Sequence, residues 1–307
     1  MKENNNLKFF TFFLIILISN PIISQNSLLQ EIDYNNEDFK VRLTAFKAHK
    51  LINGQSTKQS NKKEFFLYVA HRFGSINGGI RTLFGLDIAN TKIEMFYGLS
   101  DNFQVGFSRE SLKKTYTINF KNKITGKESD FPLNISLYNS VNYNSSEFLA
   151  PGEDLSFSQR SLFLSQLLIS RRLSEKISMQ ISPSFIKRNY NEKRLLFEDG
   201  EVIFEDGLPV YTTYDREFNY ALGIASSYKI NKRAAFNFEY YKNLNRVNNS
   251  PYSDVFSISI DLETGGHVFQ LIFSNTQSID DISSLINAEG NWSKNEIFFG
   301  FNILRIF

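Results

Sequence analysis

The chain contains no cysteine, a single tryptophan and only six prolines. Without cysteine it forms no disulfide, thiol nucleophile or cysteine-ligated metal site, and it cannot be a lipoprotein anchored through a cysteine. Lysine and arginine (34) nearly balance aspartate and glutamate (32), and the formal net charge is +2. Because the two signs are interspersed, no basic patch predicts nucleic-acid binding.

Long hydrophobic runs are also missing. The longest early stretch, from Phe9 to Ser19, has eleven residues, whereas a membrane-spanning helix needs roughly 20. It follows a lysine-containing start and precedes Pro21 and small residues near Ser24, which is typical of a secretory signal peptide. We therefore expect residues 1–24 to be a signal peptide, with cleavage near Ser24 or Gln25.

Phenylalanine (31) and tyrosine (14) are abundant, as in chains rich in strands. Apolar and polar residues alternate with a period of two in many segments; Phe256, Ile258 and Ile260, for example, enclose Ser257 and Ser259. Such alternation predicts strands rather than helices. The predicted strands, about twelve, are 64–73, 91–98, 103–110, 115–124, 132–143, 160–173, 176–188, 217–230, 233–244, 254–263, 267–275 and a terminal strand ending at Phe307.

Alternation alone would also fit a soluble sandwich, but the connections favour a membrane barrel. Short links such as 174–175 and 231–232 alternate with long ones such as 189–216 and 276–294, which is typical of up-and-down barrels in outer membranes. The links near 112–114 and 125–131 deviate from this rule. We predict an all-β fold: a single transmembrane antiparallel up-and-down β-barrel of about 12 strands over residues 63–307.

The last strand predicts how such a barrel closes. Its lipid-facing row, interrupted by Arg305, reaches Phe307, where an aromatic ring suits the membrane interface. Closure against the first strand is required because unpaired backbone groups are costly in hydrocarbon. The terminal Phe307 also resembles the signal by which barrel-assembly machinery recognises outer-membrane barrels. Residues 25–62 are polar, and two interpretations stay open: a periplasmic extension or a partial plug.

Several stretches resemble a known family. They are LINGQS (51–56), HRFGSINGG (71–79), LFGLD (83–87), YGLSDNFQVGFSR (97–109) and FGFNILRIF (299–307). Together they are similar to an uncharacterised family of outer-membrane β-barrels from Bacteroidetes-type bacteria, a domain of unknown function. The resemblance implies the fold and the location, and it implies no catalytic residue and no cofactor.

Residues that could support catalysis are few. The only histidines are His49, His71 and His267, and their positions do not predict a serine–histidine–acid triad, so we expect no enzyme. For His71 and Arg72 we favour contact with the following glycine-rich loop over a position lining the lumen. The two EDG triplets, 198–200 and 205–207, predict hairpin turns in an external loop (189–216), with RLLFEDG pairing with EVIFEDG, rather than a cation site.

The inward faces of the predicted barrel are polar and of no single sign. The candidate lumen-lining residues are Gln104, Asn119, Lys121, Gln180, Ser182, Asn237 and Glu239. Two functions follow: a narrow pore or carrier for a small solute, or a non-conducting scaffold or surface-binding barrel of a larger envelope assembly. The expected partners are outer-membrane lipid, the assembly machinery and possible envelope proteins, with no nucleic acid, metal or cofactor.

Overall fold

The computed structural model describes residues 45–125, 131–146, 154–191, 193–198, 201–213, 216–248 and 250–307. The predicted signal peptide and residues 25–44 lie outside these ranges. Among the described helices, none combines the length and the apolar character that crossing a membrane would require.

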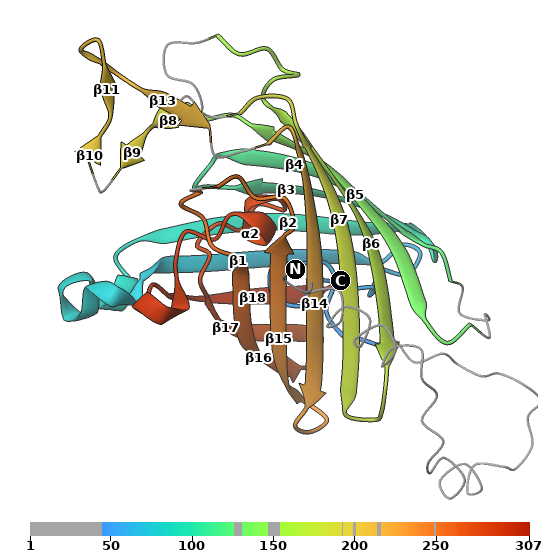
Figure 1. Ribbon diagram of the computed structural model, residues 1–307. Coiled ribbons are helices and arrows are strands. Elements are labelled where there is room, and N and C mark those ends of the chain that lie inside the picture. Colours follow the sequence, from blue (N-terminus) through green and yellow to red (C-terminus); the bar gives the residue numbers. More distant parts are fainter. Residues whose placement is uncertain are drawn as a thin grey trace, which may run out of the picture.

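Twelve antiparallel strands form a closed barrel, in which each strand pairs with its neighbours along the chain and β1 pairs with β18 (Figure 1). The strands are β1 (Phe65–Ser75), β2 (Ala89–Ser100), β3 (Phe103–Glu110), β4 (Thr115–Lys123), β5 (Asn134–Asn144), β6 (Ser161–Arg172), β7 (Ile177–Arg188), β14 (Phe218–Lys229), β15 (Ala234–Asn243), β16 (Val255–Thr264), β17 (His267–Ser274) and β18 (Phe298–Ile306). The predicted twelve-strand barrel is confirmed.

The barrel closes between its first and last strands. The pairing of β1 with β18 runs from Phe66 opposite Ile306 to Ser75 opposite Phe298, with a shift of register after Arg72. Beyond the strand end, the backbone N–H of Phe307 donates to the carbonyl of Phe65 at 2.9 Å. Closure leaves no open sheet edge in the wall.

The wall carries its apolar side chains outward. In β4, Tyr116, Ile118 and Phe120 are 38–51% exposed, whereas Thr117, Asn119 and Lys121 are at most 1% exposed. The same alternation recurs in the other strands of the barrel. Apolar residues outside and polar residues inside are the inverse of a soluble sandwich, and they are the pattern of a wall surrounded by lipid.

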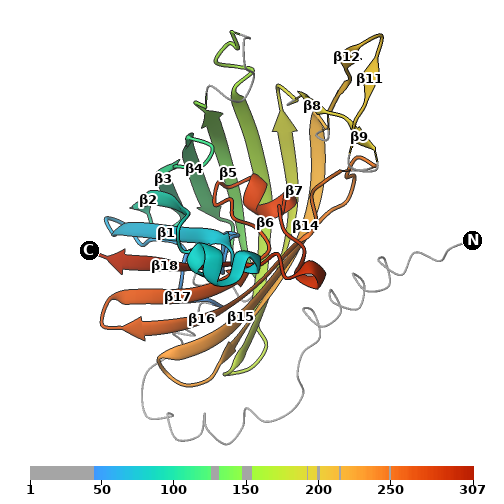
Figure 2. The same cartoon turned by 90° about the vertical axis from the view of Figure 1, so that its left-hand side faces the viewer.

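The two ends of the barrel differ. At one end, which we call the short-turn end, the strands are joined mostly by tight links such as 101–102 and 265–266; at the other, the long-loop end, they are joined by longer segments such as 145–160 and 189–217. Figure 2 shows the turn between β16 and β17 on the opposite side of the molecule from the projecting strands β8 to β13.

The long link after β7 forms a projection that we call the crown (residues 193–198 and 201–213). It holds three short pairs: β8 (Lys193–Leu195) with β13 (Tyr211–Thr213), β9 (Phe197–Glu198) with β10 (Glu201–Val202), and β11 (Phe204–Glu205) with β12 (Leu208–Pro209). The expected pairing of RLLFEDG with EVIFEDG is confirmed, and the β8–β13 pair is additional.

Three backbone hydrogen bonds join the hairpins of the crown in a ring. Leu196 donates to Val210, Val210 to Ile203, and Ile203 to Leu196, at 2.8–3.0 Å. These residues recur at intervals of seven, which is the spacing of the two EDG triplets. The repeat therefore sets the positions at which the three pairs meet.

Two segments lie inside the barrel. One is residues 45–62, which we call the plug; it precedes β1 and enters from the short-turn end. The other is the first part of residues 275–297, a segment that we call the inserted loop; it carries the buried α2 (Ser283–Ile286) and, nearer its end, η3 (Trp292–Lys294), which has no buried residue. The sequence predicted 276–294 only as one of the long links, and it did not predict that the first part of this link lies inside the barrel. Ile282, Leu285 and Ile286 are at most 1% exposed and pack against the apolar interior residues Leu164, Leu168, Ile186 and Val255.

Candidate functional site

All seven candidate lining residues have side chains that are at most 2% exposed. Four of them contact the main chain of the plug. Gln104 accepts from the N–H of Ser60 at 2.8 Å, and Gln180 accepts from the N–H of Thr57 at 3.1 Å while donating to the carbonyl of Gln55 at 2.7 Å. These amides therefore bind the plug through groups that any residue would present.

The two charged candidates bind the plug in the same way. Lys121 donates to the carbonyls of Ser56 and Lys58, both at 3.0 Å. On the opposite wall, the carboxylate of Glu239 accepts from the consecutive N–H groups of Ile52, Asn53 and Gly54 at 3.0–3.3 Å. The ammonium thus meets carbonyl oxygens and the carboxylate meets amide hydrogens.

The other three candidates bond to neighbouring wall side chains. Asn119 donates to Glu94 at 2.9 Å, Ser182 accepts from Gln180 at 3.0 Å, and Asn237 donates to Ser259 at 3.0 Å. These bonds hold the side chains of Glu94, Gln180 and Ser259 in place on the inner wall.

The plug forms a tight hairpin of its own. Ser56 N–H donates to the carbonyl of His49 at 2.8 Å, Leu51 N–H donates to that of Gly54 at 2.9 Å, and Lys50 pairs with Gln55. An added Cβ at Gly54 would lie 2.2 Å from the hydroxyl oxygen of Tyr241. Only glycine fits at this turn, where the hairpin meets the wall.

A buried cluster of charged side chains joins the plug to the inserted loop. Lys50 of the plug lies 3.0 Å from Asp281 of the inserted loop and 3.1 Å from Glu94 of β2. Lys92 lies 2.6 Å from Asp281, and the hydroxyl of Tyr138 donates to the same carboxylate. All five side chains are at most 3% exposed.

The cluster keeps its plug and loop members ionised. Burial opposes ionisation of Asp281, but Lys50 and Lys92 outweigh it and hold the pKa of that carboxyl well below its usual range. Burial likewise opposes protonation of Lys50, but Asp281 and Glu94 outweigh it and raise the pKa of the ammonium. Each group is therefore charged because of the other.

The position of Arg72 corrects our expectation. Its guanidinium is fully buried in the barrel, where it donates to Asn53 of the plug at 3.0 Å and to Asn302 of β18 at 2.9 Å, so contact with the glycine-rich loop is the wrong interpretation. The reason is strand alternation, since Arg72 shares the inward face of β1 with Tyr68 and Ala70. His71 points outward, with its Nδ1 3.1 Å from the hydroxyl of Thr91.

Two further wall residues that bond to the main chain of plug residues 49–60 were missed. Gln270 donates to the carbonyl of Leu51 at 2.7 Å, and Asn302 donates to that of Ile52 at 3.1 Å. Both are polar residues at inward positions of predicted strands, so the alternation could have identified them. Asp281 had no such signal, because it lies in a link without periodicity.

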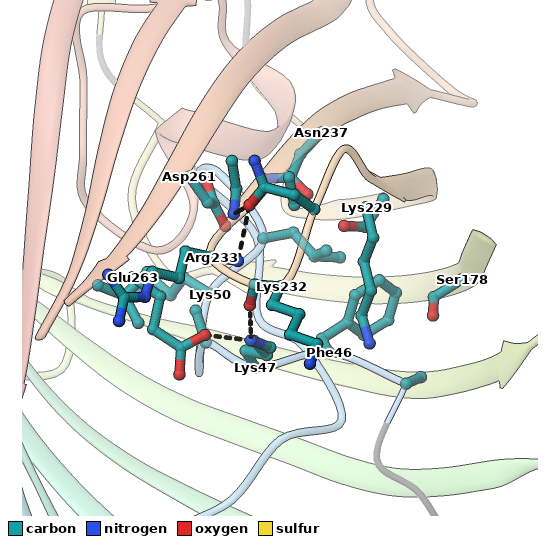
Figure 3. Close-up of a pocket in the computed structure, with 18 residues that line it drawn as sticks. Phe46, Lys47, Lys50, Ser178, Lys229, Lys232, Arg233, Asn237, Asp261 and Glu263 are labelled. Carbon is teal, nitrogen blue, oxygen red and sulfur yellow. Dashed lines mark hydrogen bonds and ion pairs between the residues drawn. The ribbon is translucent and has the colours of Figure 1, made fainter. Parts of the chain in front are cut away.

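A recess of about 570 Å³, open solvent included, lies at the short-turn end beside the start of the plug. Figure 3 shows Lys47 reaching both the carbonyl of Lys232 and the carboxylate of Glu263 across this recess. Lys229 and Arg233 also line it. The entrance of the plug is thus held by a solvent-exposed ion pair, in contrast to the buried pairs deeper in.

Several solved structures are similar to this chain, at low identity. The NanC porin has 9% identity and a TM-score of 0.47, with 79% of this chain and 98% of that chain covered. The KdgM porin has 7% identity and a TM-score of 0.44, with 78% and 98% covered. Omp33 of Acinetobacter baumannii has 10% identity and a TM-score of 0.43, with 81% and 100% covered.

No curated protein sequence matches the chain. Residues 46–307 match the model of a family described as a membrane bound beta barrel domain (DUF5777). The match begins inside the plug and includes every strand of the barrel. This chain therefore belongs to the DUF5777 family of membrane-bound β-barrels.

Proposed function

We propose that this protein is an outer-membrane pore or carrier for a small polar solute, and that the plug is its gate. Barrels with short turns at one end and longer loops at the other are typical of outer membranes, where the short turns face the periplasm. The proposal therefore orients the plug toward the periplasm and the crown toward the outside.

The observation that carries the proposal is the kind of contact between plug and wall. Wall side chains such as Gln104, Gln180 and Glu239 hold the plug by hydrogen bonds to its main chain. Water can replace such bonds, which contribute only about 0.5–1.5 kcal/mol each for the two glutamines and about 1.5–3 kcal/mol each for the Glu239 carboxylate. Release of the plug would thus exchange hydrogen-bond partners along most of the polar wall, and the buried contact of Lys50 with Asp281 is the one costly link to break.

The test is to lock the plug. Because the chain has no cysteine, a Thr57→Cys/Ser170→Cys pair introduces one defined disulfide, where the two hydroxyl oxygens now lie 2.5 Å apart. We expect no ionic current from the oxidised protein in planar bilayers and return of current after reduction. The two single-cysteine variants are the controls, and equal currents from oxidised and reduced protein would contradict a gating role.

A variant of opposite effect completes the test. Gly54→Val forces a side chain into the space that Tyr241 occupies, so we expect the plug to leave its seat and the current to rise. A Gly54→Val protein whose plug is displaced but which passes no current would exclude the pore.

A non-conducting, surface-binding barrel is the second candidate. It is favoured by the inserted loop, whose apolar residues Ile282, Leu285 and Ile286 pack inside the barrel as a core does, and by the projecting crown. The absence of current from both the reduced and the Gly54→Val proteins, together with copurifying envelope proteins, would favour this candidate.

The remaining parts of the proposal concern export and assembly. We propose that residues 1–24 direct export, that lipid surrounds the outward apolar row of each strand, and that β18 is the strand recognised by the barrel-assembly machinery. The outward row of β18 ends with Arg305, whose guanidinium lies 4.6 Å from the centre of the Phe307 ring, an arrangement suited to a membrane interface.

A further inference from the structure

The inner wall contacts the plug mainly through main-chain groups. Six wall side chains reach backbone amides or carbonyls of residues 49–60; they are Gln104, Lys121, Gln180, Glu239, Gln270 and Asn302. Side-chain partners are fewer and mostly small: Asn53 with Ser257 and Arg72, and Thr57 with Ser170. Lys50, in the charged cluster, is the exception.

The chemistry of these contacts matches a peptide backbone. Gln180 accepts from one residue of the plug and donates to the carbonyl two residues before it, as an adjoining strand would. Glu239 accepts from three consecutive N–H groups, and Lys121 donates to carbonyls on both arms of the hairpin, that of His49 and those of Ser56 and Lys58. A sugar or an inorganic ion has no such run of amide donors interleaved with carbonyl acceptors.

We infer that the solute class of this barrel is a short peptide that folds as a hairpin, and that the plug occupies the peptide site as an internal competitor. The inference rests on the proposed function to the extent that the plug must leave its seat. Because most contacts are with the main chain, the site tolerates different side chains at positions other than those equivalent to Lys50 and Gly54.

A tethered plug competes at an effective concentration in the millimolar range, so binding is measured in the full-length Gly54→Val protein in detergent micelles. Displacement of the plug is verified first, by maleimide labelling of an added Thr57→Cys. The probe is a fluorescent peptide with the sequence of residues 48–60, followed by fluorescence anisotropy. We expect binding, and its absence from a protein whose plug is displaced would overturn the inference.

Three competitors distinguish recognition of the peptide main chain from recognition of side chains or of a sugar. A peptide scrambled at every position except those equivalent to Lys50 and Gly54 should compete within a few-fold of the original. A peptide N-methylated at the residues equivalent to Asn53, Gly54 and Thr57 should compete at least tenfold more weakly, because each of three hydrogen bonds contributes about 1 kcal/mol. Failure of the scrambled peptide, unchanged competition by the methylated one, or equal competition by maltotriose would each overturn the inference.

A pair of wall variants tests the site itself. Gln180→Ala removes one donor and one acceptor to the main chain and should weaken peptide binding about tenfold. Asn142→Ala is the matched control, since Asn142 is a buried amide of β5 that donates to Ser140 of the wall, and it should leave the affinity unchanged. Equal effects of the two substitutions would contradict recognition by Gln180.

Peptide binding and ionic current are measured separately, so one proposal can be overturned while the other is kept. If the protein with a displaced plug binds peptide but passes no current, the peptide site is supported and the pore is excluded. Current without peptide binding would retain the pore and overturn the peptide as its solute class.

Discussion

At the level of single residues, the main electrostatic feature is the carboxylate of Asp281 between two buried ammonium groups. Lys50 and Lys92 lie 3.0 and 2.6 Å from it, and Glu94 supplies the second negative charge. A buried ion pair is not by itself strongly stabilising, because desolvation offsets the attraction. Removing one partner is costly, however, because the remaining charges stay buried.

Asp281→Asn should therefore destabilise the protein by about 3–5 kcal/mol. The measurement is urea unfolding in detergent micelles, followed by the change in gel migration on unfolding. The matched control is Glu263→Gln, which breaks the exposed Lys47–Glu263 pair between plug and wall and should cost less than about 1 kcal/mol. Equal losses of unfolding free energy in the two variants would contradict a stabilising role of the buried Lys50–Asp281 pair between the plug and the inserted loop.

His49 should make release of the plug depend on pH. Burial, followed by the nearby Lys121 and Lys58, lowers the pKa of its imidazole well below the usual value. Its ring is otherwise faced by Ser60, Phe66, Phe96 and the amide of Gln104, which acts in the opposite direction but is outweighed. In the released plug the ring regains a pKa of about 6.5, so protons bind the released state preferentially and acidification below pH 6.5 favours release.

The expected result is faster maleimide labelling of Thr57→Cys as the pH falls from 7.5 to 5, after correction for the reactivity of a free thiol. His49→Gln should flatten this dependence, since glutamine does not titrate. Asp281 does not interfere, because its lowered pKa confines its loss of charge to pH values below the usual aspartate range. An unchanged profile in His49→Gln would assign the dependence to another group.

Strand alternation predicted which residues of the wall are inward but not what they contact. Gln104 and Glu239 were identified as inward-facing from their strands, and their side chains are buried. Their partners, the amides of the plug, could not be predicted, because 45–62 has no periodicity that fixes its position. Arg72 was misjudged because its proximity to glycines was weighed above its place in the alternation.

At the level of elements, the twelve strands of the barrel were predicted to within two residues at nearly every boundary; β3, at 103–110, agrees exactly in range. The failure was the inserted loop. Its Ile282, Leu285 and Ile286 are apolar at helical spacing, which in a membrane barrel is compatible with the outside or with the lumen. Only the apolar interior side chains of β6, β7 and β16 decide in favour of the lumen.

The barrel is expected to fold without the crown. Its described strands pair with each other, and its ring of hydrogen bonds joins Leu196, Ile203 and Val210. Replacing residues 193–213 with a short Gly-Ser linker should change the free energy of unfolding by less than about 1 kcal/mol, because long surface loops contribute little to stability. Urea unfolding of the deleted protein measures this.

The same deletion separates the two proposed functions. A pore should keep its current without the crown, whereas a surface-binding barrel should lose its copurifying partners. A barrel that fails to fold without the crown would contradict the independence of this element.

At the level of the whole molecule, the outward apolar surface predicts a cost that depends on depth in the membrane. Ile118 lies in the middle of β4 and Ile177 begins β7 at the short-turn end; they are 51% and 40% exposed. Ile118→Lys should destabilise the barrel by about 2–4 kcal/mol in lipid, and Ile177→Lys by about 0–1 kcal/mol. Equal costs in urea unfolding from lipid vesicles would contradict a membrane-spanning wall.

The junction of β1 with β18 has a consequence for biogenesis. The plug ends at residue 62 and β1 begins at Phe65, so the hairpin is tethered beside the seam that closes last in chain order. Its Lys50 lies against Asp281 of a segment that comes immediately before β18. We therefore expect the plug hairpin to dock against the wall before β1 pairs with β18. In that order the barrel closes around a plug that is already in place.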